Sequence, residues 1–300
     1  MPEIKTWITA FRLRTLPLAL SSILMGSFIA VADEKYNLVV IALSLTTTLF
    51  LQILSNLAND YGDGVKGTDN QGRVGPMRAI QSGDISPMQM KIGIAVFVLL
   101  SLVSGIWLIV ESLGTQWYLG LLFLAIGIAA IAAAIKYTVG KNAYGYSGLG
   151  DLFVFVFFGL VAVLGTYYLN SHGLNWGILL PASSMGLLSA GVLNLNNMRD
   201  IVSDANSGKH TFALLLGIAR AKLYHNVIII LAMVLMLIYV AMNYDSLLQF
   251  LFAIAYPIMI FDLIRINKIS INSQLDPYLK RLALSTLLLT VLFGLGIILG

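Results

Sequence analysis

Two groups of acidic and amide side chains recur along the chain at matched spacing. The first lies within "NLANDYGDGVKGTDN" at 56–70, and the second lies within "NNMRDIVSDANSGKHT" at 196–211. Each group places one asparagine and two aspartates three or four residues apart: Asn56, Asp60 and Asp63 in the first, and Asn196, Asp200 and Asp204 in the second. Residues at this spacing share one face of a helix. Each group is therefore expected to direct its oxygen atoms the same way.

Carboxylates stacked on one helix face repel each other unless a cation lies between them. Asp and Asn oxygens suit a hard divalent cation, and Mg²⁺ is typically held by carboxylates together with the phosphates of a substrate. Five basic side chains near the two groups would suit the remaining phosphate oxygens: Lys66, Arg73, Arg78, Lys141 and Lys209. The alternative is that all these charges only solvate loops. Two matched groups, each followed by a glycine-containing basic loop, favour a site for a metal and a diphosphate.

The elements that carry these groups are apolar helices. Of the 300 residues, 58% are hydrophobic and 11% are charged, and the mean hydropathy is +0.88. Soluble proteins carry about 25% charged residues, so this composition indicates a polytopic membrane protein. The chain has no cysteine, which excludes disulfides and thiolate chemistry. Nine apolar segments of spanning or near-spanning length are expected, at about 16–32, 38–57, 92–111, 117–136, 149–169, 176–195, 223–242, 247–262 and 282–299.

The basic residues fall almost entirely on one side of these segments. Seventeen of the 18 lysines and arginines lie in the N-terminus or in the loops after segments two, four, six and eight, and Lys35 lies on the other side. The positive-inside rule then places the N-terminus and those loops in the cytoplasm and the C-terminus outside. This placement accounts for the net charge of +4 without a nucleic-acid partner. The expected location is a bacterial cytoplasmic (inner) membrane.

The two groups also suggest an internal repeat. Asn56 and Asp60 precede Asn196 and Asp200 by the same number of residues. We therefore expect one all-α membrane domain over residues 1–300, with two parallel four-helix halves at about 12–140 and 149–265 and a ninth helix. Such halves commonly bracket a central binding site. The expected fold is a helical bundle around a central cavity, capped by short cytoplasmic helices or loops.

Both motifs resemble the Asp-rich motifs of the UbiA superfamily of intramembrane prenyltransferases. The "NDYGDGVKGTD" form, "RLRTLPLAL" at 12–20 and "SGLGD" at 147–151 look like those of enzymes that prenylate 1,4-dihydroxy-2-naphthoate in the menaquinone pathway. The resemblance implies that Mg²⁺ and the diphosphate are held by Asn56, Asp60, Asp63, Asp200 and Asp204. It implies substrate-binding roles for Lys66, Asp69, Arg73, Arg78, Lys141, Asn196, Asn197, Lys209 and Arg14. It also places Tyr137 in the reacting pocket.

The implied reaction is an aromatic substitution on a bicyclic aromatic acid by a polyprenyl diphosphate, with loss of CO₂. The bilayer would solvate the prenyl chain and shield the allylic cation from water. Aromatic faces can stabilise such a cation, and the candidates are Tyr137, Phe153, Phe157 and Tyr167; the alternative for the last three is ordinary packing. Another acceptor such as 4-hydroxybenzoate, and a cation-coupled transporter, remain alternatives. A transporter would carry its polar residues near the bilayer midplane, whereas these lie at helix ends. Prenyl chain length and oligomeric state stay open.

Overall fold

The computed structural model describes residues 3–68 and 77–300, and these residues are largely helical. Within them, nine helical segments are long and apolar enough to cross a membrane, which confirms the expected all-α membrane fold. No strand forms in the described residues, and the one β-type pairing there is an isolated bridge between Ser147 and His210. The predictions for Asp69 and Arg73 lie outside the described residues.

The first four spanning segments are regular helices. They are α2 (Leu16–Ala32), α3 (Leu38–Lys66), α4 (Pro87–Leu113) and α5 (Trp117–Lys136). Ahead of them lie α1 (Ile4–Phe11) and the short 3₁₀ turn η1 (Leu13–Thr15).

The later segments contain more irregular helix. The fifth consists of α6 (Gly150–Val154), the π-helical η3 (Phe155–Leu164) and α7 (Gly165–Ser171). The others are η4 (Trp176–Ile178) with α8 (Leu179–Arg199), α11 (Ile218–Met242), η5 (Leu247–Ala255) with α12 (Tyr256–Lys268), and η6 (Asn272–Leu275) with α13 (Asp276–Leu299). Short helices η2 (Tyr144–Tyr146), α9 (Ile201–Asn206) and α10 (Phe212–Leu216) lie between them.

Helix α3 extends beyond the apolar segment from which it was predicted. The sequence pattern ended near residue 57, but the helix continues to Lys66 because its end is capped by Gly67 in the left-handed conformation, at φ 71°. At its start, the Asn37 side chain accepts a hydrogen bond of 2.8 Å from Val39 N–H. The extension matters because it puts Asp60 and Asp63 inside the helix, where their side chains are buried.

The largest buried core lies between α8, α11, α13 and the helices around them. Met185, Leu188 and Phe293 belong to one buried core formed largely by these helices. Glycines allow the close approach: a Cβ at Gly186 would lie 2.7 Å from the Phe155 carbonyl oxygen, so η3 and α8 meet backbone to backbone. Helix α5 is different, because none of its residues is fully buried.

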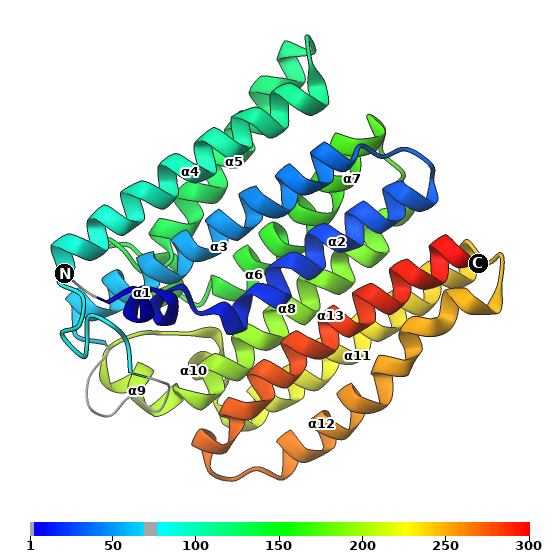
Figure 1. The fold of residues 1–300 in the computed structure, drawn as a ribbon. Coiled ribbons are helices and arrows are strands. Elements are labelled where there is room, and N and C mark those ends of the chain that lie inside the picture. Colours follow the sequence, from blue (N-terminus) through cyan, green and yellow to red (C-terminus); the bar gives the residue numbers. More distant parts are fainter. Residues whose placement is uncertain (1–2, 69–76) are drawn as a thin grey trace.

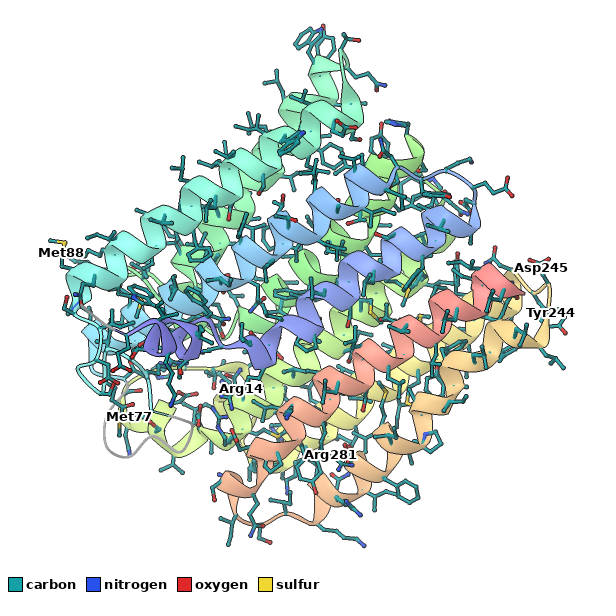
Figure 2. All side chains as sticks on the ribbon, viewed as in Figure 1. Arg14, Met77, Met88, Tyr244, Asp245 and Arg281 are labelled. Atoms are coloured by element: carbon teal, nitrogen blue, oxygen red, sulfur yellow. The ribbon has the colours of Figure 1, made fainter. Side chains whose placement is uncertain are left out.

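Three short helices gather at one end of the bundle. Figure 1 shows α1, α9 and α10 at the end where the N-terminus lies, and the C-terminus at the opposite end. Met77 and Met88 also lie toward the first end, while Tyr244 and Asp245 lie at the other (Figure 2). The expected cap over one end is therefore present. The division into two four-helix halves stays a prediction.

Candidate active site

A large cavity opens between α2, α3, α4, α5 and η3. Its volume is about 810 Å³. Most of its wall is aliphatic, but its lining also includes a set of polar and charged side chains: Arg12, Arg14, Thr15, Gln52, Asn56, Asn59, Asp63, Arg78, Tyr137, Tyr144, Asn196 and Lys209. These come mainly from the capped end of the bundle. The cavity is therefore amphipathic along its length, with a charged end and an apolar body.

Asp63 lies at the charged end and is 2% exposed. Arg78 Nη1 donates to its Oδ2 at 2.6 Å, and the Tyr146 hydroxyl donates to its Oδ1 at 2.7 Å. Arg78 Nη1 also donates to the carbonyl of Asn59 at 2.8 Å, which fixes the guanidinium against α3. Charge-assisted hydrogen bonds of this kind stabilise a buried carboxylate in its ionised form.

Asp204 of α9 supplies a second buried carboxylate close to the first. Lys209 Nζ lies 3.7 Å from its Oδ1, whereas its Oδ2 has no hydrogen-bond partner in the part of the chain that the structure describes. Burial raises the pKa of Asp204 to about 6; Lys209 opposes this shift, and the carboxylates of Asp200 and Asp63 add to it. Lys209 lines the cavity, whereas Asp204 is not among the lining residues.

The other two motif aspartates have different partners. Asp60 accepts hydrogen bonds from the backbone N–H groups of Ala79 and Ile80, at 3.1 and 3.4 Å, and so anchors the segment after α3. Asp200 accepts from Arg199, from Nε at 2.8 Å and from Nη2 at 2.6 Å. Neither carboxylate is among the groups that line the cavity. Their roles as metal ligands stay predictions.

The asparagines of the two motifs are also held by the protein. Asn56 donates to the Phe11 carbonyl at 2.8 Å and to Thr15 Oγ1 at 3.0 Å, which ties the N-terminal segment to α3. Asn196 lines the cavity and accepts from Arg199. Asn197 is buried outside the cavity lining, and its Oδ1 finds no partner among the described residues.

The basic residues expected to bind phosphate separate into two sets. Arg14, Arg78 and Lys209 line the cavity. Lys66 and Lys141 are exposed and lie outside its lining, although the Lys66 ammonium lies 3.9 Å from the centre of the Tyr146 ring. Arg14 is 4.0 Å from Asp276 at the start of α13 and keeps 41% of its side chain exposed, so it could reach a bound anion.

An aromatic series runs along the cavity wall from its charged end. Tyr137 packs edge-on against Tyr144, with ring centres 5.4 Å apart, and Tyr144 stacks on Phe153 at 4.0 Å. Phe157 follows at 6.3 Å from Phe153. Burial raises the pKa of Tyr137 well above the usual tyrosine range, and the nearby Asp151 and Asp63 carboxylates add to the shift, so its hydroxyl stays protonated. Tyr167 instead donates to Asp33 at 2.5 Å and lies outside the lining.

Similarity to known proteins shows the family to which the chain belongs. Residues 19–274 match the UbiA prenyltransferase family. The chain belongs to this family. Full-length relatives agree: it is 42% identical to the 1,4-dihydroxy-2-naphthoate octaprenyltransferase of Haemophilus influenzae, covering 99% of this chain and 97% of that protein. The protein of the same name from Escherichia coli is 40% identical, over 99% and 96%. The protein is therefore a prenyltransferase.

Solved structures share the UbiA fold. An apo UbiA homolog from Aeropyrum pernix K1 aligns with a TM-score of 0.66 at 18% identity, over 100% of this chain and 99% of that one. A UbiA homolog from Archaeoglobus fulgidus bound to DMAPP and Mg²⁺ aligns with a TM-score of 0.58 at 16% identity, over 95% and 98%. At this identity the likeness concerns the fold alone.

The charged end of this UbiA cavity fits a divalent cation bound jointly with a substrate. In the described residues, no three acidic or imidazole side chains converge to enclose a metal by themselves. Asp204 Oδ2, which is buried without a hydrogen-bond partner among the described residues, and the Asp63 carboxylate, whose charge acts on Asp204, nevertheless provide hard oxygen donors. Mg²⁺ commonly uses one or two carboxylates and completes its shell with waters and phosphate oxygens.

Four residues of the site were not singled out from the sequence, and one of them is Tyr144 in the aromatic series. Asn59 lines the cavity and lies four residues before Asp63, so the helical spacing that selected Asp63 could also have found it. Arg12 lines the cavity beside η1. Tyr146 contacts Asp63 from a loop more than 80 residues later in the chain, and no local pattern marks it.

Proposed function

We propose that the protein transfers a polyprenyl chain from polyprenyl diphosphate to 1,4-dihydroxy-2-naphthoate, with loss of the acceptor's carboxylate. The reaction would depend on Mg²⁺ and would yield demethylmenaquinol in menaquinone biosynthesis. The observation that carries the proposal is that Asp63 and Lys209 line the charged end of an apolar cavity, with Asp204 paired to Lys209. The names of the two full-length relatives support the acceptor, and UbiA homologs bound to Mg²⁺ with DMAPP or GPP support the donor and the metal.

The diphosphate would bind at the charged end of the cavity. Arg78, Lys209 and Arg14 line this end and can donate to its oxygens. Lys66, Lys141, Asn196 and Asn197 complete the expected substrate-binding set, together with Asp69 and Arg73 outside the described residues. The prenyl chain would occupy the apolar body, where a bilayer-embedded wall replaces an aqueous surface.

Mg²⁺ would be held by Asp63 and Asp204, with Asn56, Asp60 and Asp200 as the further expected ligands. When bound, it neutralises the diphosphate and makes it a better leaving group. The protein's own cations act on the same oxygens: Arg78 and Lys209 stabilise the negative charge that develops as the carbon–oxygen bond breaks.

The chemical step is an electrophilic substitution. The allylic carbon–oxygen bond breaks and its electron pair leaves with the diphosphate. The electron-rich ring of the acceptor attacks the allylic cation, a carbon–carbon bond forms, and the carboxylate leaves as CO₂ while its bonding electrons stay in the ring. Tyr137, Tyr144 and Phe153 offer aromatic faces to the cation along the wall. The enclosing helices keep water from the cation.

The expected orientation follows from charge. Seventeen of the 18 basic residues fall in the N-terminus or in the loops after the second, fourth, sixth and eighth spanning segments. We propose that this end, with the active site, faces the cytoplasm of a bacterium and that the C-terminus lies outside.

The proposal is tested with purified protein in lipid nanodiscs, Mg²⁺, a polyprenyl diphosphate and a choice of acceptors. Prenylated and decarboxylated naphthoate is the expected product, and Asp63→Asn should form it far more slowly. Absence of prenylated product from every acceptor would refute the proposed reaction. Product from 4-hydroxybenzoate alone would refute only the choice of acceptor.

A further inference from the structure

The hydroxyl of Tyr146 joins two segments of the charged end. It donates to Asp63 Oδ1 at 2.7 Å and lies 2.6 Å from Thr68 Oγ1. A tyrosine hydroxyl has a single proton. Because this proton is used on Asp63, the Thr68 hydroxyl must donate to the phenol oxygen. The result is a directed chain of hydrogen bonds from Thr68 through Tyr146 to Asp63.

The ring of Tyr146 contacts two cations. The Lys66 ammonium lies 3.9 Å from the ring centre, and the Lys209 ammonium lies 5.6 Å from it. Both distances fall within the range of a cation–π attraction. Attraction to this one ring therefore offsets part of the repulsion between the two ammonium groups.

The backbone around Tyr146 fixes this arrangement. His210 N–H donates to the Tyr146 carbonyl at 3.3 Å, and Ser147 pairs with His210 in an isolated bridge. These contacts join the loop after α5 to the loop that carries Lys209. Burial and the Asp63 carboxylate raise the pKa of Tyr146 above the usual tyrosine range, so its hydroxyl remains a donor at neutral pH.

Tyr146 does not itself line the cavity, whereas Asp63 and Lys209 do. We propose that Tyr146 is a positioning residue for the metal and the diphosphate. Its hydroxyl orients the Asp63 carboxylate for the metal, and its ring holds Lys66 and Lys209 where the diphosphate arrives. This inference rests on the proposed function for the identity of the anion.

Two substitutions distinguish the role of the Tyr146 hydroxyl from the role of its ring. Tyr146→Phe removes the hydroxyl and keeps the ring, and Tyr146→Leu removes both. Mn²⁺ replaces Mg²⁺ as a spectroscopic probe, and its dissociation constant is measured by electron paramagnetic resonance on the full-length protein without substrate. The KM for polyprenyl diphosphate is then measured at saturating Mg²⁺. Tyr61 provides a matched control, since it carries Lys91 over its ring at 5.5 Å but lies outside the cavity lining.

Tyr146→Phe is expected to weaken Mn²⁺ binding about tenfold, the size expected for a lost hydrogen bond to a charged group. Its KM for the diphosphate should stay near the wild-type value. Tyr146→Leu should weaken Mn²⁺ equally and also raise that KM by about threefold or more, because the two lysines lose their support. Tyr61→Phe and Tyr61→Leu should change neither quantity. Should Tyr146→Leu not fold, Tyr146→Met takes its place, since it also removes the ring but fills more of its space.

Wild-type Mn²⁺ affinity in Tyr146→Phe would overturn the role of the hydroxyl. An unchanged KM in Tyr146→Leu, or in Tyr146→Met where Tyr146→Leu does not fold, would overturn the role of the ring. The Mn²⁺ measurement needs no acceptor and no turnover. If the wild-type protein prenylates no acceptor while Tyr146→Phe still loses Mn²⁺ affinity, the proposed function fails and the positioning role of the hydroxyl stands.

Discussion

Lys209 and Asp204 form a buried ion pair in which only one carboxylate oxygen is engaged: Nζ lies 3.7 Å from Oδ1, and Oδ2 has no hydrogen-bond partner in the described residues. An incompletely paired buried carboxylate is costly to ionise, and the pKa of Asp204 is accordingly raised to about 6. The arrangement leaves one oxygen available to a further cation. A carboxylate oxygen of this kind is a ligand that Mg²⁺ accepts, which agrees with the proposed metal site.

This asymmetry predicts how metal binding depends on pH. Mg²⁺ needs the ionised carboxylate, so its affinity should be high above about pH 6 and should fall as the pH drops through the pKa of Asp204. In the metal-free protein, the stability that this group contributes changes with pH in the opposite direction to the metal affinity. The folded state holds the proton more tightly than the unfolded chain, so this group's contribution to stability is full below about pH 4 and is lost as the pH rises through 6.

The measurement is an Mn²⁺ titration at several pH values on wild-type protein and on Asp204→Asn. The variant should bind the metal more weakly and should lose the step near pH 6. A wild-type affinity that is flat between about pH 5 and pH 8 would contradict the raised pKa.

Arg199 should contribute more to stability than a partly exposed arginine with a similar partner. Its side chain is fully buried and bonds to Asp200, Asn196 and Asp276. Arg199→Met leaves the Asp200 carboxylate buried without its counterion, so we expect a loss of about 3–5 kcal/mol in the free energy of unfolding. The control is Arg14→Met, because Arg14 lies 4.0 Å from Asp276 and both side chains are partly exposed, so a loss of at most about 1 kcal/mol is expected there.

Denaturant unfolding in detergent measures both changes. The double variant Arg199→Met/Asp200→Asn should recover part of the loss, since it removes the uncompensated charge. Equal losses in Arg199→Met and Arg14→Met would show that burial of the Arg199 network does not increase its contribution to stability.

The number of helices could be predicted because each spanning segment is a local property. For Trp117–Lys136, the charges and turn residues at both ends coincide with the ends of the apolar run, so the predicted and observed limits agree. Hydropathy did not predict where α3 ends. Beyond the apolar segment, at the capped end of the bundle, charged residues continue the helix as readily as apolar ones. The π-helical η3 was not predicted, since its sequence is uniformly apolar and carries no signal of its hydrogen-bond register.

Helical spacing predicted which residues of the site share a helix face, but not which residues contact them. Spacing placed Asn56, Asp60 and Asp63 together, but their partners come from segments distant in sequence. Asp60 is occupied by backbone N–H groups of the segment after α3, and Asp63 by Arg78 and Tyr146. Which carboxylate faces the cavity is decided by those tertiary contacts, and a single sequence does not record them.

Gly62 should be needed for the contact between α3 and the loop after α5. A Cβ at this position would lie 2.4 Å from Thr138 Oγ1 and 2.7 Å from the Thr138 carbonyl carbon, so Gly62→Ala must separate the two segments. Because Tyr137 adjoins Thr138, we expect a loss of about 1–3 kcal/mol in stability together with reduced kcat.

A matched control is Gly127→Ala in α5, where an added Cβ would meet no atom within 4 Å. Removing a helical glycine there should stabilise the protein by about 0.5–1 kcal/mol. Unfolding free energies of the two variants in the same micelle provide the comparison. A Gly62→Ala protein as stable as wild type would mean that the loop yields without cost.

The apolar body of the cavity contains a stacked aromatic pair. Phe123 of α5 stacks on Tyr168 of α7 with ring centres 5.6 Å apart, and both line the cavity. Phe123 is ten residues from Ala133, whose carbonyl accepts a hydrogen bond from Tyr144 nearer the charged end, which places the stack about 15 Å further along α5. A chain extending from the charged end would meet this pair.

Phe123→Ala should therefore open the far part of the cavity and favour longer donors, raising the ratio of kcat/KM for a long to a short prenyl diphosphate by about tenfold. Tyr118→Ala is the control, since Tyr118 lies nearby on α5 but is 72% exposed and outside the lining. An unchanged ratio in Phe123→Ala would mean that the chain leaves the cavity before it reaches the stack.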